Sequence, residues 1–286
     1  MDKGLFCILA FFSFWLGACI ASFLNVVIWR VPRGESIVSP PSHCPKCGAA
    51  IRWYQNVPIL SWLALRGRCA ACRAPISPRY VLVEALGGVL FLAAFWKFNP
   101  LMPFVWTPLT VYLLEMWIWI ALMIVGSFID FDHQLLPDFV TVGGIALGLS
   151  FAVVKSLLIG CSMDVWNLRT FAPFLWSFAG AIFGFGLLGL VRWLGTLAFR
   201  REAMGMGDVF LMGAVGAIFG VKGVLVSLIL SSVLGSLVGL AMIAMSRARL
   251  GRFVAIPYGP YICLGCLAHM FFGQELVGWY LRLLSF

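Results

Sequence analysis

Apolar positions dominate this chain in long runs, and short polar segments separate one run from the next. Eight runs come close to the ~20 residues that an α-helix needs to cross the hydrocarbon core of a bilayer. They predict helices over residues 5–29, 80–98, 108–129, 139–160, 174–199, 208–221, 223–245 and 257–281. Glycines recur within some of them at spacings that suit close helix packing, as in Gly180…Gly184 and Gly216…Gly220. The pattern therefore predicts an all-α polytopic membrane protein with about eight transmembrane helices.

Composition and charge agree with this fold class and indicate an orientation. Of the 286 residues, 62% are hydrophobic and 11% are charged, whereas a soluble domain carries about 25% charged residues. Eight of the 20 Lys and Arg lie in residues 30–79, which hold a single acid, Glu35. Alternation of the helices puts two other Arg-rich loops, 200–207 and 246–256, on the same side, as the positive-inside rule requires of a cytoplasmic face. The net charge of +9 thus reflects topology in a lipid bilayer, and the sequence indicates no nucleic-acid partner.

Residues 30–79 form the one polar segment long enough to fold by itself, between a first helix, 1–29, and a membrane domain, 80–286. The segment carries two Cys-x-x-Cys pairs, Cys44/Cys47 and Cys69/Cys72. Four such thiolates can surround Zn²⁺, and the ion would stabilise a segment too small for a large apolar core. We therefore expect a small cytoplasmic zinc-ribbon-like domain. Two disulfides or free thiols are the alternatives, and a reducing cytoplasm disfavours the disulfides.

Four acids stand at the ends of predicted helices. Asp130 and Asp132 follow an apolar run, Asp138 opens the next one, and Asp208 ends the tetrapeptide 205–208, Gly-Met-Gly-Asp. An ionisable side chain at membrane depth costs ~2.5–3.5 kcal/mol on insertion scales, so its presence indicates a function. Two carboxylates that share a proton can act as base toward water and as acid toward a carbonyl, which is aspartic peptidase chemistry. Asp130 and Asp208 are candidates for that pair or for an ion relay in a transporter. Helix capping explains Asp138, and a solvated or supporting role explains Asp132.

Several motifs follow one another along most of the chain. They are Phe23-Leu-Asn-Val-Val-Ile-Trp-Arg-Val-Pro32, Cys44-Pro-Lys-Cys47, Asn56-Val-Pro-Ile-Leu-Ser-Trp62, Leu65-Arg-Gly-Arg-Cys69, Ile76-Ser-Pro-Arg-Tyr80, Val83-Glu84, Ile129-Asp-Phe-Asp-His-Gln-Leu-Leu-Pro-Asp138 and Gly205-Met-Gly-Asp208. This ordered set resembles the type IV prepilin peptidases, also called leader peptidase/N-methyltransferases. The chain departs from the usual pattern at Arg68, where many members have Lys, and at Val81, where Pro often follows Arg-Tyr.

The resemblance implies a peptidase in the bacterial inner membrane whose active site faces the cytoplasm. It would cut the basic leader from type IV prepilins and type II secretion pseudopilins, with Asp130 and Asp208 as the catalytic pair. Asp132 takes the place of Asp130 if the motif register is shifted. A membrane ion-coupled transporter that uses the same aspartates is the alternative function, and it leaves the cysteine segment unexplained. The cysteine segment also argues against an intramembrane protease of the presenilin type.

The resemblance implies a second activity, methylation of the new N-terminal residue with S-adenosylmethionine as the methyl donor. The cysteine-bearing segment is associated with that activity. Gly67, Arg68 and Glu84 are the candidates for the donor site. A zinc-stapled scaffold without enzymatic activity is a further alternative, and substitution of the aspartates distinguishes it from an enzyme.

Overall fold

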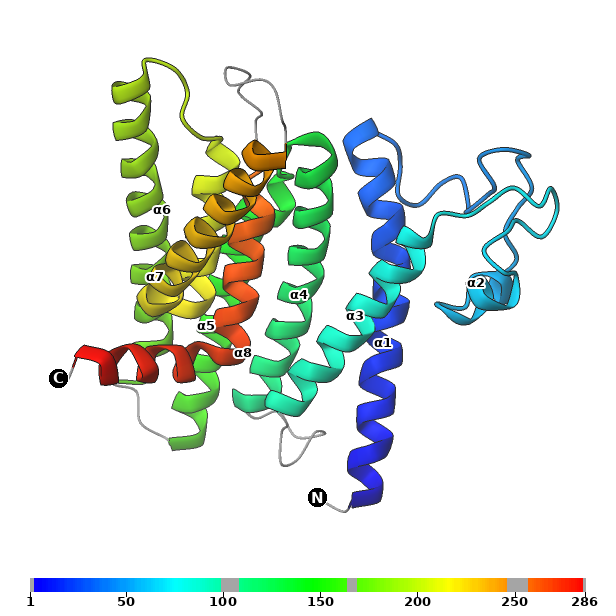
Figure 1. The fold of residues 1–286 in the computed structure, drawn as a ribbon. Helices are drawn as coiled ribbons and strands as arrows, with labels where there is room; N and C mark the ends of the chain where they lie inside the picture. Colours follow the sequence, from blue (N-terminus) through cyan, green and yellow to red (C-terminus); the bar gives the residue numbers. More distant parts are fainter. Residues whose placement is uncertain (1–2, 99–107, 164–168, 246–256, 285–286) are drawn as a thin grey trace. The chain divides into compact units, whose positions relative to one another are not determined.

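The computed structural model describes residues 3–98, 108–163, 169–245 and 257–284. Within these ranges the regular structure is helical, with two isolated β-bridges and no strand (Figure 1). Seven helices in the described part of the chain are long and apolar enough to cross a membrane. The predicted all-α membrane fold is therefore confirmed. The Arg-rich loop predicted over 246–256 lies outside the described residues.

The long helices begin and end close to the predicted bounds. They are α1 (Lys3–Arg30), α3 (Pro78–Lys97), α4 (Pro108–His133), α5 (Asp138–Met163), α6 (Ala172–Phe199), α7 (Met206–Met245) and α8 (Gly259–Leu284). Three short helices in the cysteine-bearing segment were not predicted: η1 (Val31–Arg33), η2 (Trp53–Gln55) and α2 (Leu60–Ala64). The predicted end of α4 at residue 129 is about one turn too early, so Asp130 lies inside the helix.

A single glycine explains why seven helices account for eight predicted runs. Gly220, with φ 66° and ψ −169°, divides α7 into two arms, 206–219 and 221–245. Glycine adopts this conformation readily because it has no Cβ. The chain turns back there, since Gly184 of α6 lies against both arms. The two arms correspond to the sixth and seventh predicted helices.

The internal contacts divide the chain into two compact units, residues 1–125 and 126–286, and α4 passes from the first into the second. The three-part division expected from the sequence stays a prediction. In the first unit α1 and α3 approach closely, because a Cβ at Gly17 would lie 2.5 Å from the carbonyl oxygen of Gly87. The side-chain amide of Asn25 donates to the Tyr80 carbonyl at 3.1 Å and ties the start of α3 to α1. The two helices thus hold both ends of the cysteine-bearing segment.

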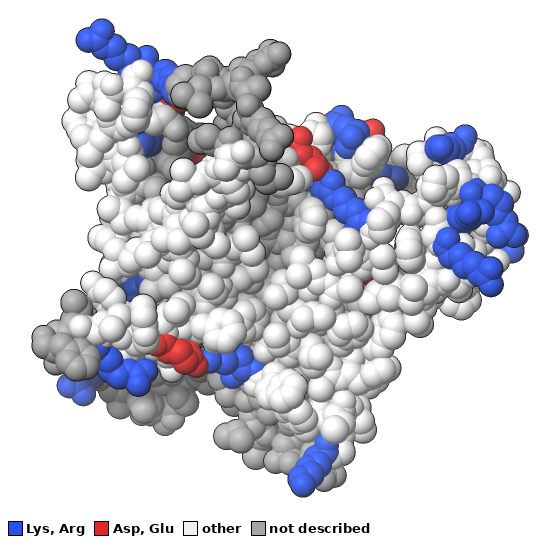
Figure 2. All heavy atoms as spheres, in the orientation of Figure 1, with Lys and Arg blue, Asp and Glu red and all other residues white. Residues whose placement is uncertain are grey.

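The cysteine-bearing segment, residues 31–77, carries the cations that the sequence concentrated there. Figure 2 shows Lys and Arg side chains gathered over it. The exposed ones are Arg33, Lys46, Arg52, Arg66, Arg68 and Arg73. Arg30, by contrast, is buried, and its guanidinium donates to the carbonyls of Ser36 and Pro40, both at 2.8 Å. These two bonds fold the start of the segment back onto the end of α1.

In the second unit the two arms of α7 pack along different neighbours. The first arm meets α6 backbone to backbone where Gly180 contacts Gly216. The second arm runs along α8, and the hydroxyl of Tyr258, just before α8, shares a hydrogen bond of 2.8 Å with that of Ser231 in this arm. This packing brings the N-terminal ends of α7 and α8 close to the end of α4.

Candidate active site and metal centre

The four cysteines of the two pairs converge on one point. The Sγ atoms of Cys44, Cys47, Cys69 and Cys72 all lie within 4.8 Å of one another, and all four cysteines are free. The sulfurs of Cys44 and Cys72 are 3.9 Å apart. A tetrahedron with metal–sulfur bonds of about 2.3 Å has edges of about 3.8 Å. The donor set therefore fits a metal ion held by four thiolates, as the sequence predicted.

Two turns of the same geometry position these thiolates. After the first pair, the N–H of Gly48 donates to the Cys44 carbonyl at 2.9 Å; after the second, the N–H of Arg73 donates to the Cys69 carbonyl at 3.0 Å. Gly48 (φ 70°) and Arg73 (φ 59°) both adopt the left-handed conformation. The sequence indicated this turn at Gly48 but not at Arg73, because an arginine pays a steric cost there.

The backbone of these turns favours the thiolate form at two positions. Hydrogen bonds from the backbone of Cys47 and of Lys46 lower the pKa of Cys44 to about 6. Backbone hydrogen bonds within the second turn likewise lower the pKa of Cys69. A backbone hydrogen bond from Ala49 acts in the same direction on Cys47, but burial and the neighbouring sulfurs raise its pKa to about 11. The cluster can therefore offer thiolate near neutral pH, and a bound cation would displace the remaining protons.

The three candidates for the methyl-donor site have structural contacts of their own. Glu84 is buried in α3, and its carboxylate accepts the N–H of Ile59 at 2.7 Å. Ile59 has φ 62°, so this bond holds a strained turn. Gly67 also has a positive φ and packs on the Trp62 ring, where a Cβ would lie 2.8 Å from the nearest ring carbon. Arg68 is exposed. Their part in binding a methyl donor stays a prediction.

Asp130 lies in the last turn of α4 and is 6% exposed. Its Oδ2 accepts the N–H of Gly259, the first residue of α8, at 3.0 Å. The first N–H groups of a helix have no partner within it, and the helix dipole makes that end attractive to negative charge. A Cβ at position 259 would lie 2.6 Å from the same carboxylate oxygen. The contact therefore depends on a glycine at the start of α8.

Asp208, the third residue of α7, is 9% exposed and lies near Asp130. The side chain of Leu136 connects the two positions, because Gly207, next to Asp208, and Gly259, which binds Asp130, both lie against it. A Cβ at these two glycines would lie 3.0 Å and 3.3 Å from the leucine. Two acids far apart in the sequence are thus gathered into one buried site at the ends of α4, α7 and α8.

The other two acids of this region have different surroundings. Asp132, in the last turn of α4, and Asp138, the first residue of α5, are both exposed. Sequence reasoning missed Gly259 and Leu136, which connect the two buried acids. The one available signal for Gly259 was the Gly-Pro step near the start of the last apolar run, because Pro is common in the first turn of a helix.

Comparison with known proteins agrees with this arrangement. The model of the bacterial Peptidase A24 N-terminal domain matches residues 15–98, and that of the type IV leader peptidase family matches residues 117–240. A protein of Myxococcus xanthus is 40% identical over 240 residues, which are 84% of this chain and 65% of that protein's length. A protein of Stutzerimonas stutzeri is 34% identical over 93% of this chain and 92% of its own length. A protein of Pseudomonas aeruginosa is 32% identical over 95% of this chain and 93% of its own length.

All three relatives are named prepilin leader peptidase/N-methyltransferase. No solved structure shows a significant match. The identity and the coverage are sufficient to show the family. This chain belongs to the type IV leader peptidase family.

Proposed function

We propose that this protein cuts the leader peptides of type IV prepilins and type II secretion pseudopilins, with Asp130 and Asp208 as an aspartate pair. The observation that carries the proposal is the buried site in which Gly259 binds Asp130 and Leu136 links it to Asp208. Buried acids in an apolar helical protein are costly to keep, so a functional site is the best explanation for them. The relatives' name supplies the reaction class.

The proposed mechanism needs no nucleophilic side chain. Two carboxylates in one buried site disfavour double ionisation, so the pair holds one proton. The ionised member takes a proton from water as the water attacks the scissile carbonyl. The protonated member donates to the carbonyl oxygen, which gives a tetrahedral diol. The C–N bond then breaks, as the carboxyl that took a proton from water gives it to the leaving amine and one diol hydroxyl returns a proton to the other carboxylate. The Gly259 N–H orients Asp130 for its part in this exchange.

The proposed location is the cytoplasmic boundary of a bacterial inner membrane. The two acids lie at helix ends and not at the middle of their spans. The cation-rich 31–77 segment and the Arg-rich connection after α6 support the assignment of this face to the cytoplasm. A prepilin with a cytoplasmic basic leader and an apolar helix behind it would present its scissile bond at the same boundary.

We further propose that the protein methylates the amine that cleavage exposes. The donor would be S-adenosylmethionine, whose sulfonium methyl passes to the amine nitrogen while the amine loses a proton. The relatives' name motivates this second activity. We assign the four-cysteine centre to Zn²⁺ in a structural role, because four thiolates leave no open position for water or substrate.

The experiment is cleavage of a prepilin by purified protein in detergent, with mass spectrometry of the product. We expect loss of the leader and, with the methyl donor present, addition of a methyl group. Asp130→Asn and Asp208→Asn should each abolish cleavage, whereas Asp132→Asn, at an exposed neighbour of Asp130, should retain it. Normal cleavage by Asp208→Asn would contradict the pair mechanism.

The alternatives predict different outcomes in the same assay. A scaffold would show no cleavage with the unsubstituted protein. A transporter would show ion flux that depends on both aspartates and no leader processing. The relatives' names, which describe leader processing, give the transporter no support.

A further inference from the structure

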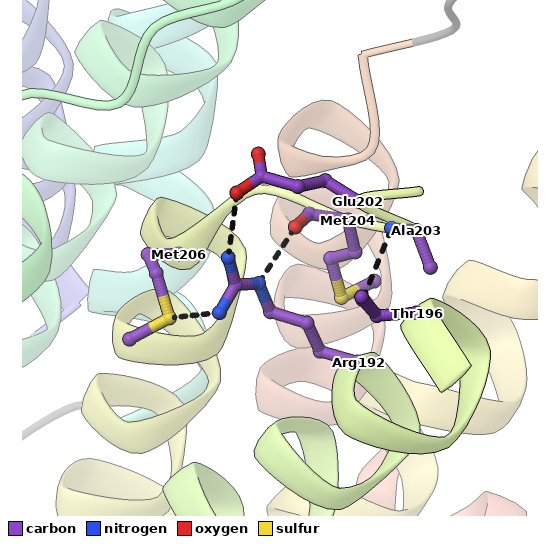
Figure 3. Close-up of polar contacts among 6 residues, drawn as sticks. All are labelled: Arg192, Thr196, Glu202, Ala203, Met204 and Met206. Carbon is purple, nitrogen blue, oxygen red and sulfur yellow. Dashed lines mark hydrogen bonds and ion pairs between the residues drawn. The ribbon is translucent and has the colours of Figure 1, made fainter. Parts of the chain in front are cut away.

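A cluster of polar contacts joins α6 to the chain that leads into Asp208. Arg192, near the end of α6, donates through Nε to the carbonyl oxygen of Met204 at 2.9 Å. One terminal nitrogen of its guanidinium lies 3.0 Å from the sulfur of Met206, and the other lies 3.4 Å from a carboxylate oxygen of Glu202. Figure 3 shows that the three partners come from the connection and the first residue of α7, and surround the guanidinium. One side chain of α6 thus binds three positions of the segment before Asp208.

This segment needs external support to have one conformation. Residues 200–205 are not helical, and most of them are exposed. Gly205 and Gly207 flank Met206, and glycine restricts the backbone less than any other residue. Arg192 binds on both sides of Gly205, at Met204 and at Met206. Asp208 is only two residues beyond that second contact, so movement of the segment would move its carboxylate.

The three contacts differ in what they can contribute. Glu202 is 81% exposed, and an ion pair so open to water is worth little. The bond to the Met204 carbonyl is a charge-assisted hydrogen bond to the backbone itself, which is stronger and fixes the path of the chain. A guanidinium can engage several partners at once because its five N–H groups form a rigid planar fork, whereas a lysine ammonium acts as a point donor.

We propose that Arg192 is a positioning residue that holds Asp208 in register with Asp130 by clamping residues 204–206 against α6. The clamp rests on the proposed function, because it acts through Asp208 as a member of the catalytic pair. In this proposal Arg192 acts through Asp208 and not on the substrate itself. The clamp would set the rate of the chemical step more than the binding of the prepilin, since a displacement of about 1 Å in a reacting group can cost about a hundredfold in rate.

The test compares four variants of the full-length protein in detergent. Arg192→Gln removes the fork, and Arg192→Lys keeps the charge and the flexible stem. Glu202→Gln removes only the exposed ion pair. Arg200→Gln removes one positive charge, as Arg192→Gln does, but from the connection after α6. Prepilin cleavage is measured as kcat and KM, the folded state by the thermal midpoint, and methylation with a synthetic peptide that carries the mature pilin N-terminus.

We expect Arg192→Gln to lower kcat about tenfold to a hundredfold, with KM changed less than about threefold, and Arg192→Lys to lie between it and the unsubstituted protein. Glu202→Gln and Arg200→Gln should stay within about threefold of the unsubstituted rate. The thermal midpoint and methylation of the mature peptide should be unchanged in Arg192→Lys, which separates positioning from a general loss of structure.

Three results would overturn the clamp. The first is normal kcat in Arg192→Gln. The second is an equal loss in Glu202→Gln, which would make the ion pair the important contact. The third is a parallel loss of cleavage, methylation and thermal midpoint in both Arg192 variants, which would make the residue structural. Absence of cleavage by the unsubstituted protein would instead overturn the proposed peptidase, and the clamp with it.

Discussion

Substitution of Gly259 by alanine tests the contact that organises the site. The new Cβ would lie 2.6 Å from Oδ2 and 3.2 Å from Cγ of Asp130, and 3.3 Å from the Leu136 side chain. Carbon and oxygen atoms do not remain this close, so the carboxylate must move by several tenths of an ångström. That movement weakens the 3.0 Å bond from the Gly259 N–H. A hydrogen bond to a charged group contributes about 1.5–3 kcal/mol, and each 1.36 kcal/mol of lost transition-state stabilisation is about tenfold in rate. The expected loss in kcat is therefore about tenfold to a hundredfold.

Gly278→Ala is the matched control, because Gly278 lies in the same helix and a Cβ there meets nothing within 4 Å. Alanine is the better helix former by about 1 kcal/mol, so neither substitution should unfold α8 through the backbone. The assay is the initial rate of prepilin cleavage under saturating substrate, with the thermal midpoint measured on the same preparations. Equal rates for Gly259→Ala and Gly278→Ala would refute the view that the start of α8 positions Asp130.

Other parts of the molecule yield further expectations. Purified protein should contain about one zinc ion per chain, and a strong chelator should make residues 31–77 sensitive to protease, because the segment has little apolar core of its own. Arg73→Gly should raise the resistance of this segment to chelation, since it removes a left-handed arginine that costs about 1–2 kcal/mol; a lowered resistance would argue against strain there. Gly180→Ala should sharply reduce the thermal midpoint, because its Cβ would meet the backbone at Gly216 and lie 2.7 Å from the Cα of Gly220. Gly186→Ala in the same helix, where a Cβ meets nothing within 4 Å, should leave the midpoint unchanged or raise it.

The membrane helices could be predicted because lipid leaves few alternatives. Every backbone group that crosses the hydrocarbon must be satisfied within the helix, so an apolar run of sufficient length has one solution. Even the break at Gly220 was visible as a boundary between two runs, although its positive φ was not. The extra turn at the end of α4 was missed, because Asp130 and Asp132 resemble the start of a polar loop. In the structure this turn places Asp130 on a helix, where its direction is fixed.

The four-cysteine cluster was predictable from the sequence, because the spacing of each Cys-x-x-Cys pair restricts the turn between its two thiols. The contacts of the acidic site were not predictable in this way. The Gly259–Asp130 bond joins α8 to α4 over a sequence separation of 129 residues. No local sequence pattern specifies which helix start will meet which helix end. The same holds for Arg192, which from the sequence is one more cation near the end of a predicted helix and gives no sign of its three partners.

The acidic site illustrates where an apolar helical protein can keep water chemistry. The interior of a helix has no free backbone polar groups, because each N–H and C=O is bonded within the helix. Only the helix ends have unpaired backbone donors and acceptors. The site lies where α4 ends and where α7 and α8 begin, and the free N–H of Gly259 at the start of α8 donates to the Asp130 carboxylate. Glycines at 207 and 259 allow these helix starts to approach the Leu136 side chain closely. For this reason the ends of these spans, where backbone N–H groups are free to bind a carboxylate, suit the proposed chemistry better than their centres.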